Sequence, residues 1–417
     1  MRAYERLLKY VAVHTASDEN SETVPSTMRQ FDLAKLLVEE MKELGISDAR
    51  VDEHCYVYGS LPAASGCEKA PKIGLIAHMD TAPDFCGENV HPVLIENYDG
   101  EDVVLGSSGR VLSVKQFPHL KNLKGKTLIT TDGTTLLGAD DKAGIAEILT
   151  VIEELIGRKL PHGPIRIAFT PDEEIGRGPD AFDVPGFDAD FAYTVDGGEE
   201  GGIEYETFNA CSARWQVNGF NVHPGTAKDT MINALSVAIE INSLLPAVEV
   251  PEHTEGYEGF YHLMHMDGNV ESARMSYIIR DHDRSVFEAR KRCMRQIEKF
   301  INEKYGAGTA VLILKDSYYN MAEKILPYPF LTEIPKEAAR EAGLKLTILP
   351  VRGGTDGSKL SFMGLPCPNL GTGGYAFHGP FEHTTAEGMD LSVKMIIDIL
   401  GRFAAMDRKD CQVKKEA

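Results

Sequence analysis

The chain has 417 residues, of which 43% are hydrophobic and 25% are charged, a composition that excludes a disordered protein. Its formal net charge of -20 argues against a nucleic-acid partner. No stretch approaches the roughly 20 apolar residues of a membrane span, so we expect no membrane partner. The length exceeds one ordinary hydrophobic core and predicts two domains, or one domain with a large insertion.

The cysteines and the first residues of the chain bear on its location. Seven cysteines are scattered along the sequence without a C-x-x-C pair, so neither a disulfide framework nor a zinc ribbon is predicted. Residues 1–13 contain Arg2, Glu5, Arg6 and Lys9 in place of the unbroken apolar core of a signal peptide. We therefore expect a cytoplasmic protein.

Strand and helix patterns alternate through the first half of the chain. The pattern of residues 26–44 predicts an amphipathic helix with Ser26 as its N-cap. Apolar residues recur at helical spacing in residues 143–158, which predicts a helix packed on a sheet. Strands are predicted at 49–61, 72–77, 128–129, 165–170 and 190–195. This alternation predicts an α/β fold with a mostly parallel, doubly wound sheet.

From about residue 208 the pattern changes to that of a small α+β layer. Strands are predicted at 208–219, 272–280 and 309–315, and helices at 225–245 and 284–305. The first pattern then returns, with a helix at 330–342, a strand at 344–350, a glycine-rich turn at 353–357 and a closing helix at 390–407. We therefore predict a first domain of residues 1–207 and 320–417, into which a smaller domain, 208–319, is inserted.

Histidine and acidic residues follow the predicted strands at the points where the strands end. Five short segments share this placement: 78–80, 138–142, 172–174, 196–198 and 378–379. The carboxyl ends of parallel strands border the crevice in which open α/β sheets bind ligands. The sequence therefore predicts that these segments build one site.

Each segment has a plain structural interpretation as well. His78 alone is more often a packed core residue than a ligand, and the doublet of Asp140 and Asp141 could cap a helix. Adjacent Glu173 and Glu174 are harder to explain this way, because like charges repel unless a cation or solvent relieves them. One glutamate could bind a metal while the other takes a proton from water.

The number of candidate ligands decides between one metal and two. His78, Asp140, Glu174, Asp196 and His378 provide two imidazoles and three carboxylates, more than the three protein ligands of a mononuclear catalytic zinc. If one carboxylate bridges, each ion obtains three protein ligands and shares a water or hydroxide with the other, roughly 3.5 to 4 Å away. The pattern therefore predicts a two-metal hydrolytic centre.

Longer segments around these residues carry a resemblance to a known family. They are 78–83, 138–144, 170–178, 196–198, 223–228, 277–281, 352–358 and 377–380, and together they span nearly the whole chain. They resemble the co-catalytic dizinc family of aminopeptidases, aminoacylases and glutamate carboxypeptidases, and are most similar to its tripeptide aminopeptidases.

The resemblance implies a role for each segment. Asp140 would bridge two zinc ions, one completed by His78 and Asp196 and the other by Glu174 and His378. Glu173 would be the general base that deprotonates the bridging water and passes the proton to the leaving amine. Asp80 would be a supporting carboxylate that fixes the tautomer of a histidine ligand.

The implied activity is hydrolysis of the N-terminal peptide bond of tripeptides. A dipeptidase and an N-acyl-amino-acid deacylase of the same family remain as alternatives, because they share the metals and differ in the pocket. A catalytically inactive binding protein is disfavoured by the intact Glu173 and ligand set. Serine hydrolysis would need a G-x-S-x-G motif, which the sequence lacks. The expected partners are short peptides and a second copy of the chain, bound through the inserted domain.

Four residues are candidates for substrate binding. By the resemblance, His223 would stabilise the oxyanion, in its own subunit or across a dimer, and Arg280 would clamp the substrate carboxylate. A plain salt bridge of Arg280 with Asp281 or Asp283 is the alternative. Arg352 and the turn after it could hold the substrate backbone or form only a tight turn.

The remaining details of the match are less regular. Asn269 is a weaker substrate-binding candidate, since its spacing is imperfect. His282 stands where an aromatic residue is expected, which puts the side-chain specificity in doubt. His383 is a second histidine close to His378, and the flanking residues favour His378 as the ligand.

Overall fold

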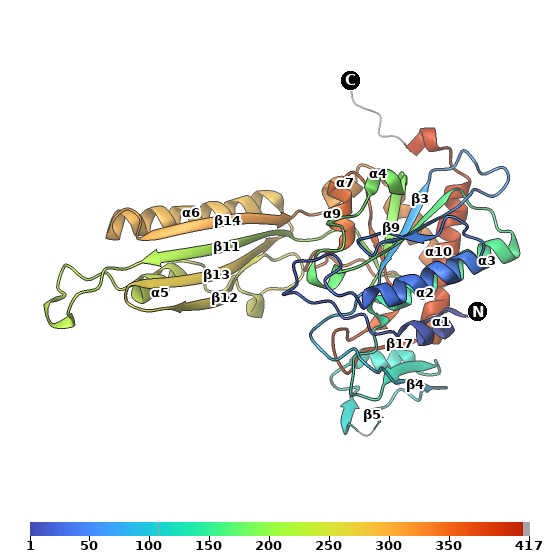
Figure 1. Cartoon of the computed structure of the whole chain (residues 1–417), viewed down its shortest axis with the longest axis horizontal. Coiled ribbons are helices and arrows are strands. Elements are labelled where there is room, and N and C mark those ends of the chain that lie inside the picture. The colour runs from blue at the N-terminus through green and yellow to red at the C-terminus, as the bar shows by residue number, and fades with distance from the viewer. Residues whose placement is uncertain (107, 412–417) are drawn as a thin grey trace. The chain divides into compact units, whose positions relative to one another are not determined.

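The computed structural model describes residues 1–106 and 108–411, which form two compact units (Figure 1). Of these residues, the first unit contains those in 1–205, 321–349 and 355–411, and the second contains 206–320 and 350–354. Residues 350–354 join the second unit through backbone bonds: Val351 N–H donates to Glu206 O (2.9 Å) and Phe208 N–H to Gly353 O (3.2 Å).

The main sheet of the first unit has seven strands in the order β1-β2-β8-β3-β9-β15-β10. In that order they are Arg50–Val51, Val57–Leu61, Ile165–Thr170, Ile73–His78, Phe191–Val195, Asn369–Leu370 and Ile203–Glu204. The central strands β8, β3, β9 and β15 run parallel, and the outer pairs are antiparallel. All residues of β3 and β9 are buried, as expected for parallel strands covered on both faces. The predicted α/β fold is confirmed.

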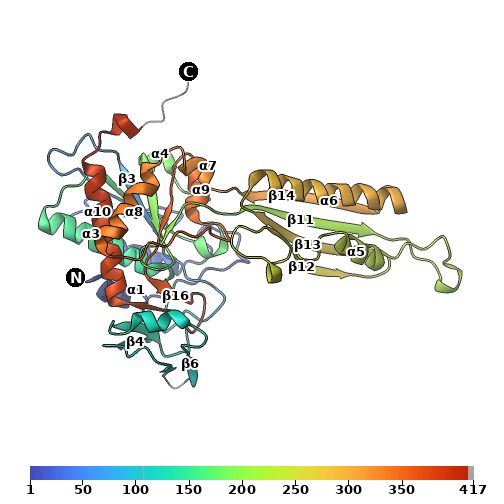
Figure 2. The same ribbon diagram turned by 180° about the vertical axis from the view of Figure 1, so that it is seen from behind.

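Helices cover both faces of this sheet (Figure 2). Ile73, Leu75 and Ala77 of β3 share a core with α1 (Ala3–Tyr10), α2 (Gln30–Glu43), α3 (Ala139–Arg158), α7 (Ala322–Ile325), α8 (Phe330–Ala342) and α10 (Ala386–Ala404). Ile76 belongs to the opposite core, with α4 (Val184–Phe187) and α9 (Asp356–Phe362). In the described part of the chain no helix is both long and apolar enough to cross a membrane.

The first unit also contains a second sheet, of four strands, of which only the strand at 128–129 was predicted. Its order is β16-β17-β7-β4, and the strands are Gly374–Tyr375, His383–Thr385, Leu128–Thr131 and Pro92–Ile95. A separate hairpin pairs β5 (Val103–Leu105) with β6 (Arg110–Leu112). The sheet joins segments far apart in sequence, because Thr384 of β17 lies opposite Ile129 of β7.

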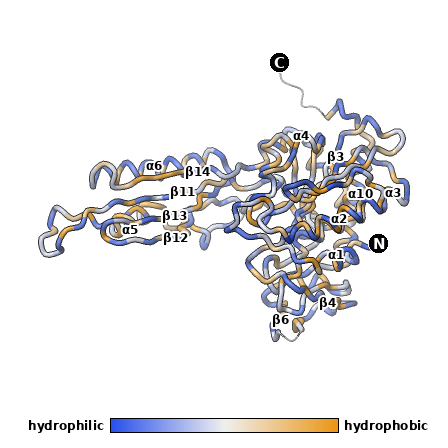
Figure 3. Tube along the Cα trace, in the orientation of Figure 1, coloured by the Kyte–Doolittle hydropathy of each residue, from blue (hydrophilic) through white to orange (hydrophobic). Residues whose placement is uncertain are grey.

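The second unit is an antiparallel sheet, β12-β13-β11-β14, with two helices on one face. The strands are Phe260–Gly268, Ser272–Asp281, Asn209–Asn218 and Ala310–Tyr318, and the helices are α5 (Ala234–Ser243) and α6 (Arg284–Tyr305). Cys211, Ala213, Trp215 and Val217 of β11 are buried beneath the helices while the residues between them are more exposed. Figure 3 shows hydrophobic and hydrophilic residues, in orange and blue, mixed along the strands and helices of this unit. β12 was not predicted, because only its first two residues are buried.

Two helix starts differ from prediction. Helix α2 begins at Gln30, and Ser26 does not cap it; the Ser26 hydroxyl lies 2.5 Å from Asp172 Oδ1 instead. The helix predicted from residue 225 begins at Ala234, because the Asn233 side chain accepts hydrogen bonds from Leu235 N–H and Ser236 N–H.

Three differences follow residue 343. The strand predicted at 344–350 does not form, and Thr347 makes only an isolated bridge to Gly202. Leu344 is buried, but Ile348 and Leu349 are 38% and 62% exposed, so most of this segment does not pack as a strand. The predicted turn at 353–357 leads into α9, which is capped by Thr355. The closing helix begins at Ala386 and ends at Ala404.

The buried Glu147 on α3 yields a prediction about stability. Neither carboxyl oxygen has a hydrogen-bond partner in the described residues, and burial raises the pKa of Glu147 well above its usual value. The folded chain therefore holds a proton that the unfolded chain releases above about pH 4.5, so Glu147 lowers stability increasingly as pH rises. We expect Glu147→Gln to remove up to about 1.4 kcal/mol of this loss per pH unit. Thermal denaturation of both proteins from pH 5 to 8 measures the slope; parallel curves would contradict the prediction.

Candidate metal centre

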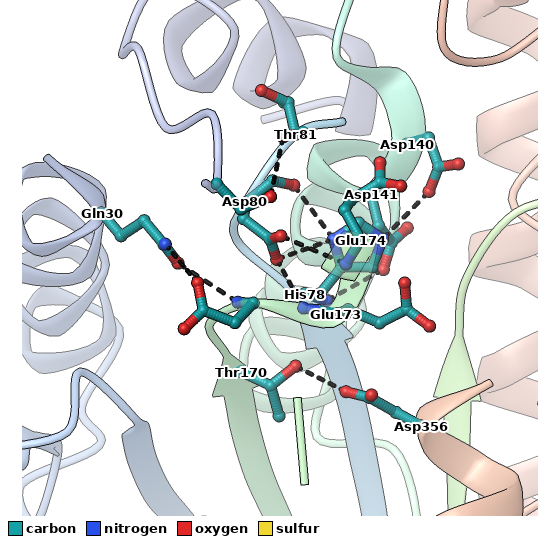
Figure 4. Close-up of polar contacts among 12 residues, drawn as sticks. Gln30, His78, Asp80, Thr81, Asp140, Asp141, Thr170, Glu173, Glu174 and Asp356 are labelled. Atoms are coloured by element: carbon teal, nitrogen blue, oxygen red, sulfur yellow. Dashed lines mark hydrogen bonds and ion pairs between the residues drawn. The ribbon is translucent and has the colours of Figure 1, made fainter. Parts of the chain in front are cut away.

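The five predicted ligands all lie in the first unit. Figure 4 shows three of them, His78, Asp140 and Glu174, close together. His78 is the last residue of β3, and Asp196 follows β9 directly. Glu174 lies in a short 3-10 helix, Glu173–Ile175, that begins three residues after β8 ends. Asp140 is the second residue of α3, and His378 lies between β16 and β17. The predicted convergence of these segments is what the fold produces.

Two groups of side chains place their ligand atoms close enough to share an ion. His78, Asp140 and Glu174 form one group, and His78, Asp141 and Asp196 form the other, with all ligand atoms of a group within 4.8 Å. His78 Nε2 lies 3.0 Å from Asp140 Oδ1 and 3.7 Å from Asp196 Oδ1. One nitrogen of His78 therefore faces several carboxylates.

Asp140 lies between the two histidines. Its Oδ1 faces His78, and its Oδ2 lies 3.5 Å from His378 Nε2, which is also 2.9 Å from Glu174 Oε2. His378 has a left-handed backbone, with φ of 62°, that is uncommon for a residue other than glycine. Each oxygen of Asp140 thus faces a different histidine, which is the arrangement expected of a bridging carboxylate.

Asp80 supports both His78 and the glutamate pair. His78 Nδ1 lies 3.0 Å from the carbonyl oxygen of Asp80 and 3.4 Å from Oδ1 of the same residue. Asp80 therefore accepts a hydrogen bond from Nδ1–H, which leaves Nε2 as the nitrogen that can bind an ion. The Asp80 carboxylate also accepts hydrogen bonds from Glu173 N–H (3.0 Å) and Glu174 N–H (3.2 Å).

Three further carboxylates of the site were not assigned from sequence. Asp141 accepts hydrogen bonds from His78 N–H (3.2 Å) and Gly144 N–H (3.2 Å). Asp172 accepts from Ser26 N–H and from the Gln30 amide, both at 2.7 Å. The acidic residues at 140–141 and 172–174 were visible in the sequence, but which of them face the two histidines and which accept backbone hydrogen bonds was not.

Asp356 is the third. It is buried, its Oδ2 accepts a hydrogen bond from the Thr170 hydroxyl (2.9 Å), and a Cβ at Gly178 would collide with its carboxylate. Burial raises the pKa of Asp356 to about 7. In the sequence, Asp356 was predicted only to belong to a glycine-rich turn, 353–357.

Burial and crowding shift the pKa values across the site. Burial raises the pKa of Glu174 to about 7 and that of Asp196 well above its usual value. Hydrogen bonds to Asp140 and Glu174 raise the pKa of His378 to about 11. Burial opposes protonation of His78, but the charges of Asp196, Asp140 and Asp80 outweigh it and raise its pKa. The raised pKa values of His78 and His378 therefore show that the surrounding carboxylates favour positive charge at these two side chains.

The donor set fits divalent cations. Glu174 Oε1 is buried and has no hydrogen-bond partner among the described residues, although its other oxygen faces His378. A buried carboxylate oxygen without a partner is costly, and an ion beside it would remove that cost. Two imidazole nitrogens with several carboxylates are ligands that zinc and related ions accept.

The substrate-binding candidates lie in the second unit. His223 is exposed, and its Nδ1 accepts a hydrogen bond from Gly225 N–H (3.1 Å). Arg280 donates to Ile279 O (2.9 Å) and stacks over the Tyr318 ring. It forms no ion pair with Asp281, which instead pairs with Arg290 (2.8 Å).

Arg352, Asn269 and His282 are engaged inside the second unit. Arg352 donates to Gly256 O (2.9 Å) and Glu258 O (2.8 Å), and so holds that loop. The side-chain oxygen of Asn269 accepts from the two N–H groups that close the turn between β12 and β13. His282 is buried and lies 3.1 Å from Val351 O.

His383 in the first unit is also engaged. It is buried; its Nδ1 donates to Phe381 O (2.7 Å) and its Nε2 lies 2.9 Å from His119 Nε2. Both ring nitrogens therefore serve the fold.

Comparisons with known proteins give consistent results. Residues 205–309 match the family model described as a peptidase dimerisation domain. The chain is 56% identical to peptidase T of Caldanaerobacter subterraneus subsp. tengcongensis, covering 96% of this chain and 98% of that protein. A tripeptidase structure from Staphylococcus aureus shares the fold with a TM-score of 0.76 at 23% identity, covering 97% and 98% of the two chains. A Bacillus subtilis dinuclear metal-binding peptidase shares it with a TM-score of 0.63 at 13% identity, covering 96% and 98%.

The raised pKa values of His78 and His378 predict how an ion binds. The raised pKa values favour a second proton on each ring in the ion-free chain, and an ion that binds must displace that proton. We expect divalent-ion binding to release protons, with affinity rising up to about tenfold per pH unit for each proton released. Calorimetric titration with Co²⁺ in buffers of different ionisation enthalpy measures the number released. Binding without proton release between pH 6 and 8 would contradict the assignment.

Proposed function

The chain belongs to the peptidase T family and is a peptidase, and we propose that it is a dizinc aminopeptidase that removes the N-terminal residue from tripeptides. The observation that carries this proposal is Asp140, whose two oxygens face His78 and His378. His78, Asp140 and Asp196 would hold one zinc ion, and Asp140, Glu174 and His378 the other. When bound, the two ions would act as Lewis acids that lower the pKa of a water and polarise the scissile carbonyl.

Glu173 is the proposed general base. No described residue donates a hydrogen bond to its carboxylate, while its backbone N–H is fixed by Asp80. Burial raises the pKa of Glu173 well above its usual value, and Asp356 adds to the shift. Such a carboxylate can take a proton from the attacking water and return it to the leaving amine.

The second unit supplies the proposed substrate contacts. His223 would stabilise the oxyanion, and Arg280, Arg352 and Asn269 would bind the peptide, although the last two already make bonds within their own unit. The match to a peptidase dimerisation domain supports a homodimer formed through this unit. We also propose a cytoplasmic location, since all seven cysteines are free thiols.

The general base is tested by Glu173→Gln, which keeps the size of the side chain and removes its basicity. We expect turnover to fall by about 10²- to 10⁴-fold, because a positioned base contributes that much. Metal content, measured by atomic emission, should remain at the wild-type value. Glu154→Gln on α3, where the half-exposed glutamate pairs only with Arg158 among the described residues, is the matched control. Full activity in Glu173→Gln would remove Glu173 from the base role.

Substrate length separates this proposal from the dipeptidase and deacylase alternatives. We expect kcat/KM for Ala-Ala-Ala to exceed that for Ala-Ala, Ala-Ala-Ala-Ala and acetyl-alanine, with alanine released first from the amino end. Chromatography of the products over time identifies the bond that is cut. Preference for Ala-Ala or for acetyl-alanine would replace the aminopeptidase by the corresponding alternative.

A further inference from the structure

Glu382 joins the two loops that carry Asp140 and His378. It is buried, and its carboxylate accepts three backbone hydrogen bonds: Oε2 from Leu137 N–H and Gly138 N–H, both at 2.8 Å, and Oε1 from Asp140 N–H at 2.9 Å. Glu382 lies four residues after His378 in sequence, whereas the N–H groups that it binds lie more than 240 residues earlier. One side chain thus fixes the distance between two distant loops.

The 137–140 backbone is shaped to receive an anion. Gly138 has φ of 77°, which turns successive N–H groups towards one side, as in the concave backbone nests that bind anions. A side chain at Gly138 would approach Thr81 Cγ2 to 3.2 Å in this strained conformation. The nest is therefore occupied by the chain's own Glu382.

Two other contacts hold the loop that carries His378, one on each side of it, but neither involves His378 itself. Tyr375 O–H donates to Glu200 Oε2 (2.9 Å) before His378, and His383 contacts His119 after it. Glu382 is the member of this set that also contacts a proposed ligand, through the Asp140 N–H. Its removal should therefore affect the His378 to Asp140 distance more than the loss of another anchor.

We propose that Glu382 is a positioning residue that sets His378 opposite Asp140, so that the ion held by Asp140, Glu174 and His378 depends on it. This inference rests on the proposed function, because it concerns one of the two proposed ions. The ion at His78 and Asp196 depends on it less, since His78 is oriented by Asp80 and Asp141.

The test is Co²⁺ binding to the full-length chain, followed by calorimetry and visible absorption. Glu382→Gln keeps the shape of the side chain and replaces one of its two accepting oxygens by an NH2 group, which donates and cannot accept. We expect Glu382→Gln to lower the affinity for one of the two Co²⁺ ions by about 10- to 100-fold, as for other residues that orient metal ligands. Its absorption spectrum should resemble that of His378→Ala, and the double variant should bind no worse than His378→Ala.

Glu387→Gln is the matched control. Glu387 also accepts a backbone hydrogen bond, from Thr127 N–H (2.7 Å), but that bond anchors a strand and touches no proposed ligand. We expect Glu387→Gln to lower the melting temperature without changing either Co²⁺ affinity. Glu382→Asp, which keeps the charge on a shorter side chain, should bind the weakened ion with intermediate affinity.

The outcomes separate this inference from the function on which it rests. If the wild-type chain binds fewer than two ions, or cleaves no tripeptide, the proposed function fails. If the wild type passes and Glu382→Gln binds both ions within about twofold of wild type, the positioning role is overturned and the function stands. Should Glu382→Gln not fold, Glu382→Asp decides by the same criterion; failure of both to fold would assign Glu382 to the fold itself and overturn the proposal.

Discussion

The carboxylates of Asp140, Glu174 and Asp196 share a largely buried region with His78, and their mutual repulsion governs the chemistry of the first unit. In a medium of low polarity such charges cannot all persist unless positive charge lies among them. Protons supply it in the ion-free chain, as the raised pKa values of His78, His378 and Asp196 indicate. Divalent ions at the same place would supply more positive charge and would also satisfy the unpartnered Glu174 oxygen.

Backbone N–H groups stabilise the carboxylates that surround this centre. Asp80 accepts from the two glutamates, Asp141 from His78 and Gly144, and Glu382 from the loop before α3. Gly144 lies on α3 together with Asp141, but every other donor belongs to a different segment from its carboxylate, so each of those bonds fixes two segments together. Backbone donors add no mobile charge, which leaves the ligand atoms to face the cations. These hydrogen bonds therefore stabilise the carboxylates and hold the segments of the site together.

Sequence patterns predicted the elements that depend on continuous apolar runs. β3, β8 and β9 were found because each is a short buried run, and the polar residues that follow them mark the carboxyl edge of the sheet. The pattern failed where burial is partial or turns intervene. β12 buries only its first residues, 344–350 stays irregular, and Asn233 delays the start of α5. Local composition cannot report such features, because they depend on what packs against the segment.

The sequence by itself determined which residues could form the site, since His78, Glu173, Glu174 and Asp196 follow strands whose ends must meet in a parallel sheet. Only the tertiary structure decided their partners. Asp140 lies between two histidines that are 300 residues apart in sequence, Asp80 accepts a hydrogen bond from His78, and Glu382 accepts one from Asp140 N–H. The physical reason is that spacing along a strand or helix sets the direction of a side chain. The distance between side chains on different loops depends instead on the packing and hydrogen bonds that bring those loops together.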